Sequence, residues 1–286
     1  MARLAETLKI IEHHRRQSPH YSELLDILEE ILILREDYKR NFPEIIFPIP
    51  DHHIREKLAG GFPLIDFSKA SFDVTRPREY FFSLMRIAEK RSPEETRGIA
   101  EKIIDGTLQY EKMVRRMFEP VEDDGEEKEE KKAGKQEGKE ETEAFDLVEL
   151  FLEESLRPEL EKVADKYRDQ IESSSWEEGY CPICGKEPKI GRIKDDENRR
   201  YLFCNQCGFE WSFMRIRCPF CGNEDQQELA YFTVEDDERY RVDVCNACKR
   251  YIKMVDFRET KETPNLDVED IATLHLDMLA NDEGYE

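Results

Sequence analysis

The eight cysteines of this chain could bind metal ions, because all of them lie between Cys181 and Cys248 and all belong to Cys-x-x-Cys pairs. Two residues between paired cysteines let a tight turn direct both sulfurs at one ion, with backbone N–H groups free to bond to the thiolates. Thiols spaced in this way are expected to hold a metal. The sequence therefore predicts two metal sites, formed by Cys181, Cys184, Cys204 and Cys207, and by Cys218, Cys221, Cys245 and Cys248.

An internal repeat favours this sequential pairing over a cross-braced one. The first and third pairs share Cys-Pro-x-Cys-Gly, the second and fourth share Cys-Asn-x-Cys, and strand-like runs at 201–203 and 240–244 precede the second and fourth. Each repeat unit resembles a closed ribbon of two hairpins, which a cross-brace would divide. Glycine follows the first three pairs, as a left-handed turn favours, but Lys249 follows the fourth, so the fourth turn is expected to differ in geometry or exposure.

Complete ligation by cysteine limits the chemistry of both sites. Four cysteines leave no open position for a substrate, so hydrolysis through a metal-bound water is not expected. Thiolates accept iron and zinc alike, and the spacing does not choose between these metals. We interpret the sites as structural or one-electron redox centres that each hold one ion of iron or zinc. No catalytic residue and no other cofactor site is assigned, and the chain is not expected to be an enzyme.

The residues around the cysteines indicate an α+β protein with a helical amino-terminal part. In the segment 21–40, apolar residues and Arg35 recur at spacings of three and four, and helical periodicity returns at 145–171. We expect a helical domain at 1–175 with a disordered acidic insertion at about 120–143, cysteine modules at 176–212 and 213–262, and a C-terminal helix and tail at 263–286. One helix from about Val268 to Leu279 is expected to pack Ile271, Ala272, His275 and Met278 or Leu279 on one side.

Composition argues against two classes of partner. The formal net charge of −22 opposes binding to nucleic acid, even though Arg199, Arg200, Arg215 and Arg217 lie near the cysteines. With 38% apolar residues and a mean hydropathy of −0.77, the chain is not expected to enter a membrane. Its first residues lack the apolar core of a signal peptide, and paired cysteines suit a reducing compartment, so we expect a cytoplasmic protein.

Short motifs around the cysteines extend the pattern beyond metal binding. They lie at 180–185, 200–207, 210–211, 215–218, 245–248, 251–253, 270–277 and 284–285, and Gly-Gly-Phe-Pro-Leu-Ile-Asp at 60–66 adds an element of the helical part. In these segments the chain resembles the formate dehydrogenase accessory protein family called FdhE.

The resemblance implies a helical domain joined to two tandem rubredoxin-like modules. It also implies a cytoplasmic maturation factor that binds the catalytic subunit of a molybdenum- or tungsten-dependent formate dehydrogenase, with iron as a metal of the family. A rubredoxin-like electron carrier with two iron–thiolate centres is the alternative function, and a zinc-ribbon nucleic-acid binder is a third that the charge disfavours. The sequence assigns neither the partner-binding surface nor the oligomeric state.

Overall fold

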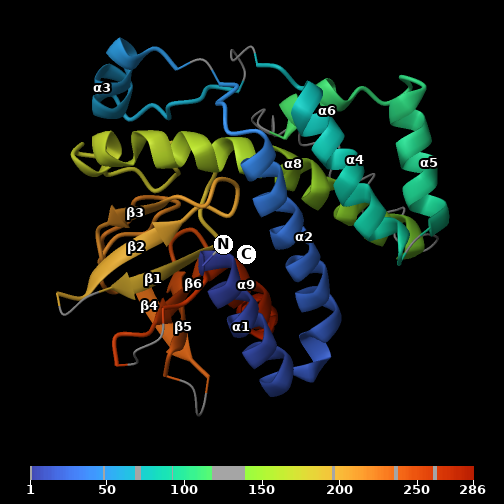
Figure 1. The fold of residues 1–286 in the computed structure, drawn as a ribbon. Helices are drawn as coiled ribbons and strands as arrows, with labels where there is room; N and C mark the ends of the chain where they lie inside the picture. The colour runs from blue at the N-terminus through green and yellow to red at the C-terminus, as the bar shows by residue number, and fades with distance from the viewer. Residues whose placement is uncertain are drawn as a thin grey trace, which may run out of the picture.

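A computed structural model shows a helical part packed beside a mixed β-sheet (Figure 1). It describes residues 2–47, 49–67, 72–91, 93–117, 139–194, 197–234, 238–259 and 263–286. Together with the C-terminal helices and the two cysteine groups within the sheet region, this arrangement confirms the predicted α+β class. Within the described residues, no helix combines the length and the apolar character needed to cross a membrane.

The helical part is built around one long helix. Its elements are α1 (Ala2–Gln17), the short 3₁₀ turn η1 (Pro19–Tyr21), α2 (Ser22–Asn41), α3 (Asp51–Ala59), α4 (Thr75–Glu89), α5 (Pro93–Ile104), α6 (Tyr110–Arg116) and α8 (Lys139–Glu172). The helix α8 contacts α2, α3, α4 and α6, and it buries Phe151, Leu156, Leu160 and Val163 at the spacing of a helical face. Helices from both sides of the acidic segment therefore share one core.

The acidic segment itself is described only at its end. Residues 120–138 of the predicted insertion lie outside the described residues, and residues 139–143 form the beginning of α8.

Six strands form one sheet rather than two separate ones. The strands are β1 (Ile190–Lys194), β2 (Arg199–Phe203), β3 (Glu210–Phe213), β4 (Leu229–Thr233), β5 (Tyr240–Cys245) and β6 (Arg250–Asp256), in the order β3-β2-β1-β6-β5-β4. Each cysteine module supplies three antiparallel strands, and the parallel pairing of β1 with β6 joins the two halves, with Ile190 opposite Lys253. The boundaries predicted for the modules remain predictions, since the sheet is continuous across them.

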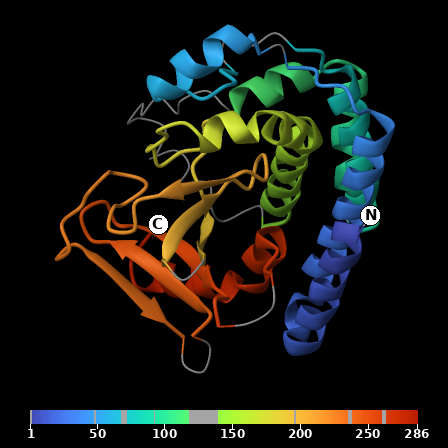
Figure 2. The ribbon, with the colours of Figure 1, turned by 60° about the vertical axis from the view of Figure 1, so that its left-hand side comes forward.

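The C-terminal segment forms two helices, which corrects the prediction of one. The helix α9 (Leu266–Ala272) ends at Thr273, whose φ of −114° and ψ of 24° depart from helical values, and α10 (Leu274–Asp282) begins at once. The change of direction buries Leu276 and Ala280 and leaves Met278 and Leu279 exposed, contrary to the expected apolar side. In Figure 2 these helices lie between the sheet and α1. Accordingly, α9 contacts α1, α2 and β1, while α10 contacts β5 and β6.

Candidate metal centres

The structure brings the eight sulfurs together in the two groups that the repeat predicts. In the first centre, formed by Cys181, Cys184, Cys204 and Cys207, the Sγ atoms of Cys181 and Cys207 are 3.3 Å apart and those of Cys184 and Cys204 are 3.5 Å apart. In the second centre, formed by Cys218, Cys221, Cys245 and Cys248, both corresponding distances are 3.7 Å. These distances exclude disulfides, whose sulfurs are about 2 Å apart.

The donor sets fit a four-coordinate cation. A tetrahedral centre with metal–sulfur bonds of ~2.3 Å separates its sulfurs by about 3.8 Å, close to the spacing of both groups. Within each group the four sulfurs all lie within 4.8 Å of one another. An arrangement with four converging thiols and no other kind of donor suits soft metals that prefer sulfur.

The turns that hold the cysteines share one backbone form. The N–H of Cys181 donates to the carbonyl of Lys186 at 2.9 Å, and the N–H of Gly185 donates back to the carbonyl of Cys181 at 2.9 Å. The first three turns place glycine in the left-handed region, with φ between 68° and 76°. Lys249 has φ 59° and its N–H donates to the carbonyl of Cys245 at 2.8 Å, so the fourth turn keeps the geometry of the others; its second cysteine, Cys248, is partly exposed, whereas Cys184 and Cys207 are buried. A lysine in this conformation costs about 1 kcal/mol.

The first centre is enclosed by the helical part of the molecule. Its four cysteines are at most 5% exposed and belong to the same apolar core as α4 and α8. The N–H groups of Leu64 and Ile65 donate to the carbonyls of Pro182 and Ile183 at 2.8 and 2.9 Å, within the first cysteine turn. The Gly-Gly-Phe-Pro-Leu-Ile-Asp element at 60–66 therefore serves to cover this centre.

The second centre reaches the surface. Cys218 and Cys245 are buried, but Cys248 is partly exposed and Cys221 is exposed. The guanidinium of Arg250 lies 3.8 Å from the ring centre of Phe220, inside the third cysteine turn, and its nitrogens pair with Glu187 at 2.7 and 3.0 Å. The two centres therefore have the same ligands in different surroundings.

The thiols need a cation if all four are to ionise together. In the first centre burial raises the pKa of Cys181 and Cys207. Burial also opposes ionisation of Cys204, but hydrogen bonds from the other three thiols lower its pKa. In the second centre burial raises the pKa of Cys248 to about 12, whereas backbone N–H groups of Cys248 and Ala247 outweigh burial and lower the pKa of Cys245 to about 7. A bound metal ion would take the place of the remaining protons.

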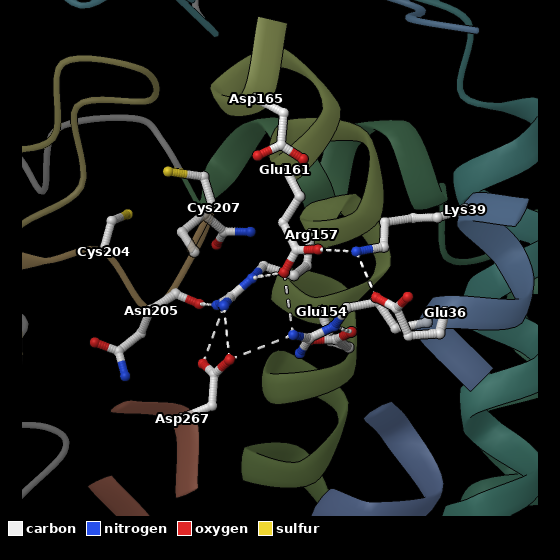
Figure 3. A network of polar contacts seen from close by, with 12 residues as sticks. Glu36, Lys39, Glu154, Arg157, Glu161, Asp165, Cys204, Asn205, Cys207 and Asp267 are labelled. Atoms are coloured by element: carbon white, nitrogen blue, oxygen red, sulfur yellow. Dashed lines mark hydrogen bonds and ion pairs between the residues drawn. The ribbon is translucent and has the colours of Figure 1, made fainter. Parts of the chain in front are cut away.

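A buried polar network connects the first centre to three helices (Figure 3). Arg157 of α8 donates to the backbone carbonyl of Asn205, between Cys204 and Cys207, and contacts both carboxylate oxygens of Asp267 in α9 at 2.9 and 3.0 Å. Its Nε also donates to Glu161 at 2.8 Å. One guanidinium therefore joins the second cysteine turn to α8 and α9.

A second arginine ties α2 into the same network. Arg35 donates to both carboxylate oxygens of Glu154 at 2.6 and 2.8 Å, and to Glu161 at 3.2 Å. Lys39 approaches Glu161 at 2.7 Å. Burial alone would raise the pKa of Glu161, but the nearby charges of Arg35, Arg157 and Lys39 lower it to about 2, so this carboxylate stays ionised.

The side chains between the second pair of cysteines add two more contacts. Asn205 donates to Asp270 of α9 at 2.9 Å, and Gln206 donates to the backbone carbonyl of Glu153 in α8 at 2.7 Å. Sequence reasoning missed this network, because most of its partners lie about 50 to 130 residues apart. The sequence feature that could have revealed the network was Arg35, a charged residue on an otherwise apolar helical face. In the structure Arg35 is only 5% exposed.

Comparisons with known proteins agree with this architecture. Residues 180–215 match the family model described as FdhE, central domain, and residues 216–286 match FdhE, C-terminal domain. A protein FdhE homolog from Aquifex aeolicus is 26% identical over 95% of this chain and 88% of its own length. A homolog from Pseudomonas aeruginosa is 33% identical, but over only 37% of this chain and 36% of its own length.

A solved structure shows the same fold over nearly the whole chain. The crystal structure of the FdhE protein from Pseudomonas aeruginosa matches with a TM-score of 0.62 and 18% identity, over 99% of this chain and 91% of that protein. The match includes the helical part, which neither family model covers.

We predict that Arg157→Met destabilises the protein by about 3 kcal/mol, because the change leaves buried carboxylates and the Asn205 carbonyl without their shared cation. Urea unfolding of the metal-loaded protein measures this cost. The matched control is Arg168→Met on the same helix, where a half-exposed arginine pairs with Asp165 and Glu172. Its loss should cost at most about 1 kcal/mol. Equal costs for the two variants would contradict the structural role assigned to Arg157.

Proposed function

We propose that this chain, which belongs to the FdhE family, is an accessory protein that binds the catalytic subunit of a molybdenum- or tungsten-dependent formate dehydrogenase during its maturation. The two FdhE domains matched over residues 180–286, together with the similarity to the Aquifex aeolicus homolog along the chain, support a role in formate dehydrogenase maturation. A cytoplasmic location suits this role, because thiolate ligands persist in a reducing compartment.

The coordination chemistry supports a binding protein rather than an enzyme. Both centres offer four cysteines, which fill a tetrahedral shell and leave no position for a substrate. The single observation that carries the proposal is the enclosure of the first centre by α8, α9 and the element at 60–66. Around the first centre, the cysteine turns and the helices form one framework. Such a framework can present a surface to a partner.

We also propose that all eight cysteines are metal ligands and that each centre holds one ion of iron or zinc. The burial of the first centre supports a structural role, since a metal there would fix the second cysteine turn against α8 and α9. The exposure of Cys221 favours a second candidate function, that of an electron carrier, for the second centre alone. Iron in an exposed thiolate centre could exchange one electron with a partner.

Metal analysis distinguishes the roles of the two centres. The anaerobically purified chain should contain two metal ions, and Cys204→Ser and Cys221→Ser should each lose one. Cys204→Ser should also lower the midpoint of urea unfolding strongly, because its centre lies in the shared core, whereas Cys221→Ser should lower it little. Iron would give ferric–thiolate absorption and zinc would give none. Full metal content in both variants would contradict the ligand assignment.

Co-purification tests the maturation role. The tagged chain should retain the catalytic subunit of formate dehydrogenase when that subunit is produced without its cofactor, and it should release the mature enzyme, since a maturation factor must part from its finished product. An unrelated molybdoenzyme subunit serves as the control for non-specific capture. Failure to retain the catalytic subunit in any folding state would contradict the proposal.

A further inference from the structure

A pocket beside the second centre has a composition that neither metal binding nor the fold explains. Its volume is about 300 Å³, enough for one or two side chains of a ligand. The strands β2, β4, β5 and β6 and the segment 215–220 line it, and the sulfur-bearing residues Cys218 and Cys245 form part of its wall. The opposite face of β5 packs Val242 into a core with Leu276 of α10, whereas Arg241 and Asp243 of the same strand line the pocket.

The charge of the pocket is opposite to that of the chain. Acidic residues outnumber basic ones by 66 to 44 in the whole sequence. The described residues that line the pocket instead include one carboxylate, Asp243, and five arginines, which are Arg200, Arg215, Arg217, Arg241 and Arg250. Arginine is the side chain best suited to bind carboxylates through two parallel hydrogen bonds.

These arginines are incompletely matched by the protein. Asp243 serves both Arg241, whose Nε lies 2.8 Å from it, and Arg200, whose Nη2 lies 3.4 Å away. Arg200 is 3% exposed, and its Nε has no hydrogen-bond partner among the described residues. Burial lowers the pKa of Arg200, as expected for a cation that lacks full compensation.

The arginines nearest the thiolates differ from those farther away. Arg250 is paired with Glu187 and is attracted by Cys248 and Cys218 of the second centre, and Cys218 also attracts Arg200. In contrast, Arg215 is exposed and forms no ion pair within the described part of the chain. The metal centre can therefore account for part of the positive charge, but not for Arg215.

Exposed apolar side chains lie beside these arginines. Ile216 is 48% exposed and Tyr231 is 64% exposed, and both line the pocket, while the neighbouring Met214 is 47% exposed. The guanidinium of Arg241 lies 5.1 Å from the ring centre of Tyr231. Arginine, tyrosine and methionine are enriched where proteins bind other proteins. The strand β4, which carries Tyr231, is also at the end of the sheet, and its outer edge has no neighbouring strand among the described residues.

We propose that this pocket and the adjoining edge of β4 bind an acidic segment of a partner polypeptide, with its carboxylates on the arginines and its apolar side chains against Tyr231 and Ile216. The apolar border and the free strand edge favour a polypeptide over a small inorganic anion, which would use neither. The proposal rests on the proposed function only in that the chain binds a protein partner. It adds the surface and the chemistry that this partner must offer.

The experiment uses an end-blocked, fluorescently labelled peptide that alternates glutamate with leucine, titrated with the metal-loaded full chain and followed by anisotropy. Binding should weaken with increasing salt, since the contacts are charged. Arg215→Gln should weaken it about threefold, and the double variant Arg215→Gln/Arg241→Gln about tenfold or more. The matched control is Arg199→Gln, which removes an exposed arginine of β2 that does not line the pocket and should leave binding unchanged.

Several outcomes would overturn this proposal. In the first, a peptide that alternates glutamine with leucine binds as tightly as the acidic one; in the second, inorganic phosphate at about millimolar concentration displaces the acidic peptide as a tight competitor. The first result would show that the pocket does not recognise the carboxylates of the peptide, and the second would show that the pocket is a small-anion site. Because Arg215 is exposed, its variant should fold even if the double variant does not. The assay contains no formate dehydrogenase, so its failure leaves the maturation role to the co-purification experiment.

Discussion

Arg157, which is 2% exposed, lies where charged and polar groups from four parts of the chain meet. Its guanidinium contacts the carbonyl of Asn205 in the second cysteine turn, Glu161 in α8 and Asp267 in α9, while Arg35 from α2 shares both carboxylates. Removing one of these groups would strand the others, because an unpaired charge is costly when it is buried. The helices and the first centre therefore reach their positions together.

This constraint explains why two similar cysteine modules have different surroundings. The first shares a core with α4 and α8 and is covered by the element at 60–66, so its centre acts as part of the helical framework. The second packs one face of its strands on α10 and leaves the other face to the arginine pocket. The two modules repeat one cysteine pattern and one arrangement of three antiparallel strands. The first module lies within the shared core, while the second has a surface on which Cys221 and Arg215 are exposed.

Local spacing in the sequence was sufficient to predict the cysteine groups and the strands that precede them. The runs at 201–203 and 240–244 lie in β2 and β5, and the sulfurs group sequentially, because each turn is encoded within a few residues. The left-handed turn at Lys249 was not foreseen, since the turn's hydrogen bond outweighs a preference worth about 1 kcal/mol.

Features that depend on distant residues could not be predicted in this way. The parallel pairing of β1 with β6 joins segments about sixty residues apart, and the contact of Arg157 with Asp267 spans 110 residues. Thr273 interrupts the C-terminal helix because packing on both α1 and the sheet requires a change of direction. Arg200, Arg215 and Arg217 were noted near the cysteines, but Arg241 and Arg250 were not, because only the sheet brings these two to the same pocket.

Hydrogen–deuterium exchange of the metal-loaded chain and its two single-centre variants tests most directly whether the first centre and the helices form one cooperative unit. Cys204→Ser should speed exchange throughout α2, the 152–171 part of α8 and α9, because loss of the first metal frees the turn that holds Arg157. Cys221→Ser should speed exchange only around β4 and β5. Unchanged protection of α8 in Cys204→Ser, or an equal loss in both variants, would contradict the account.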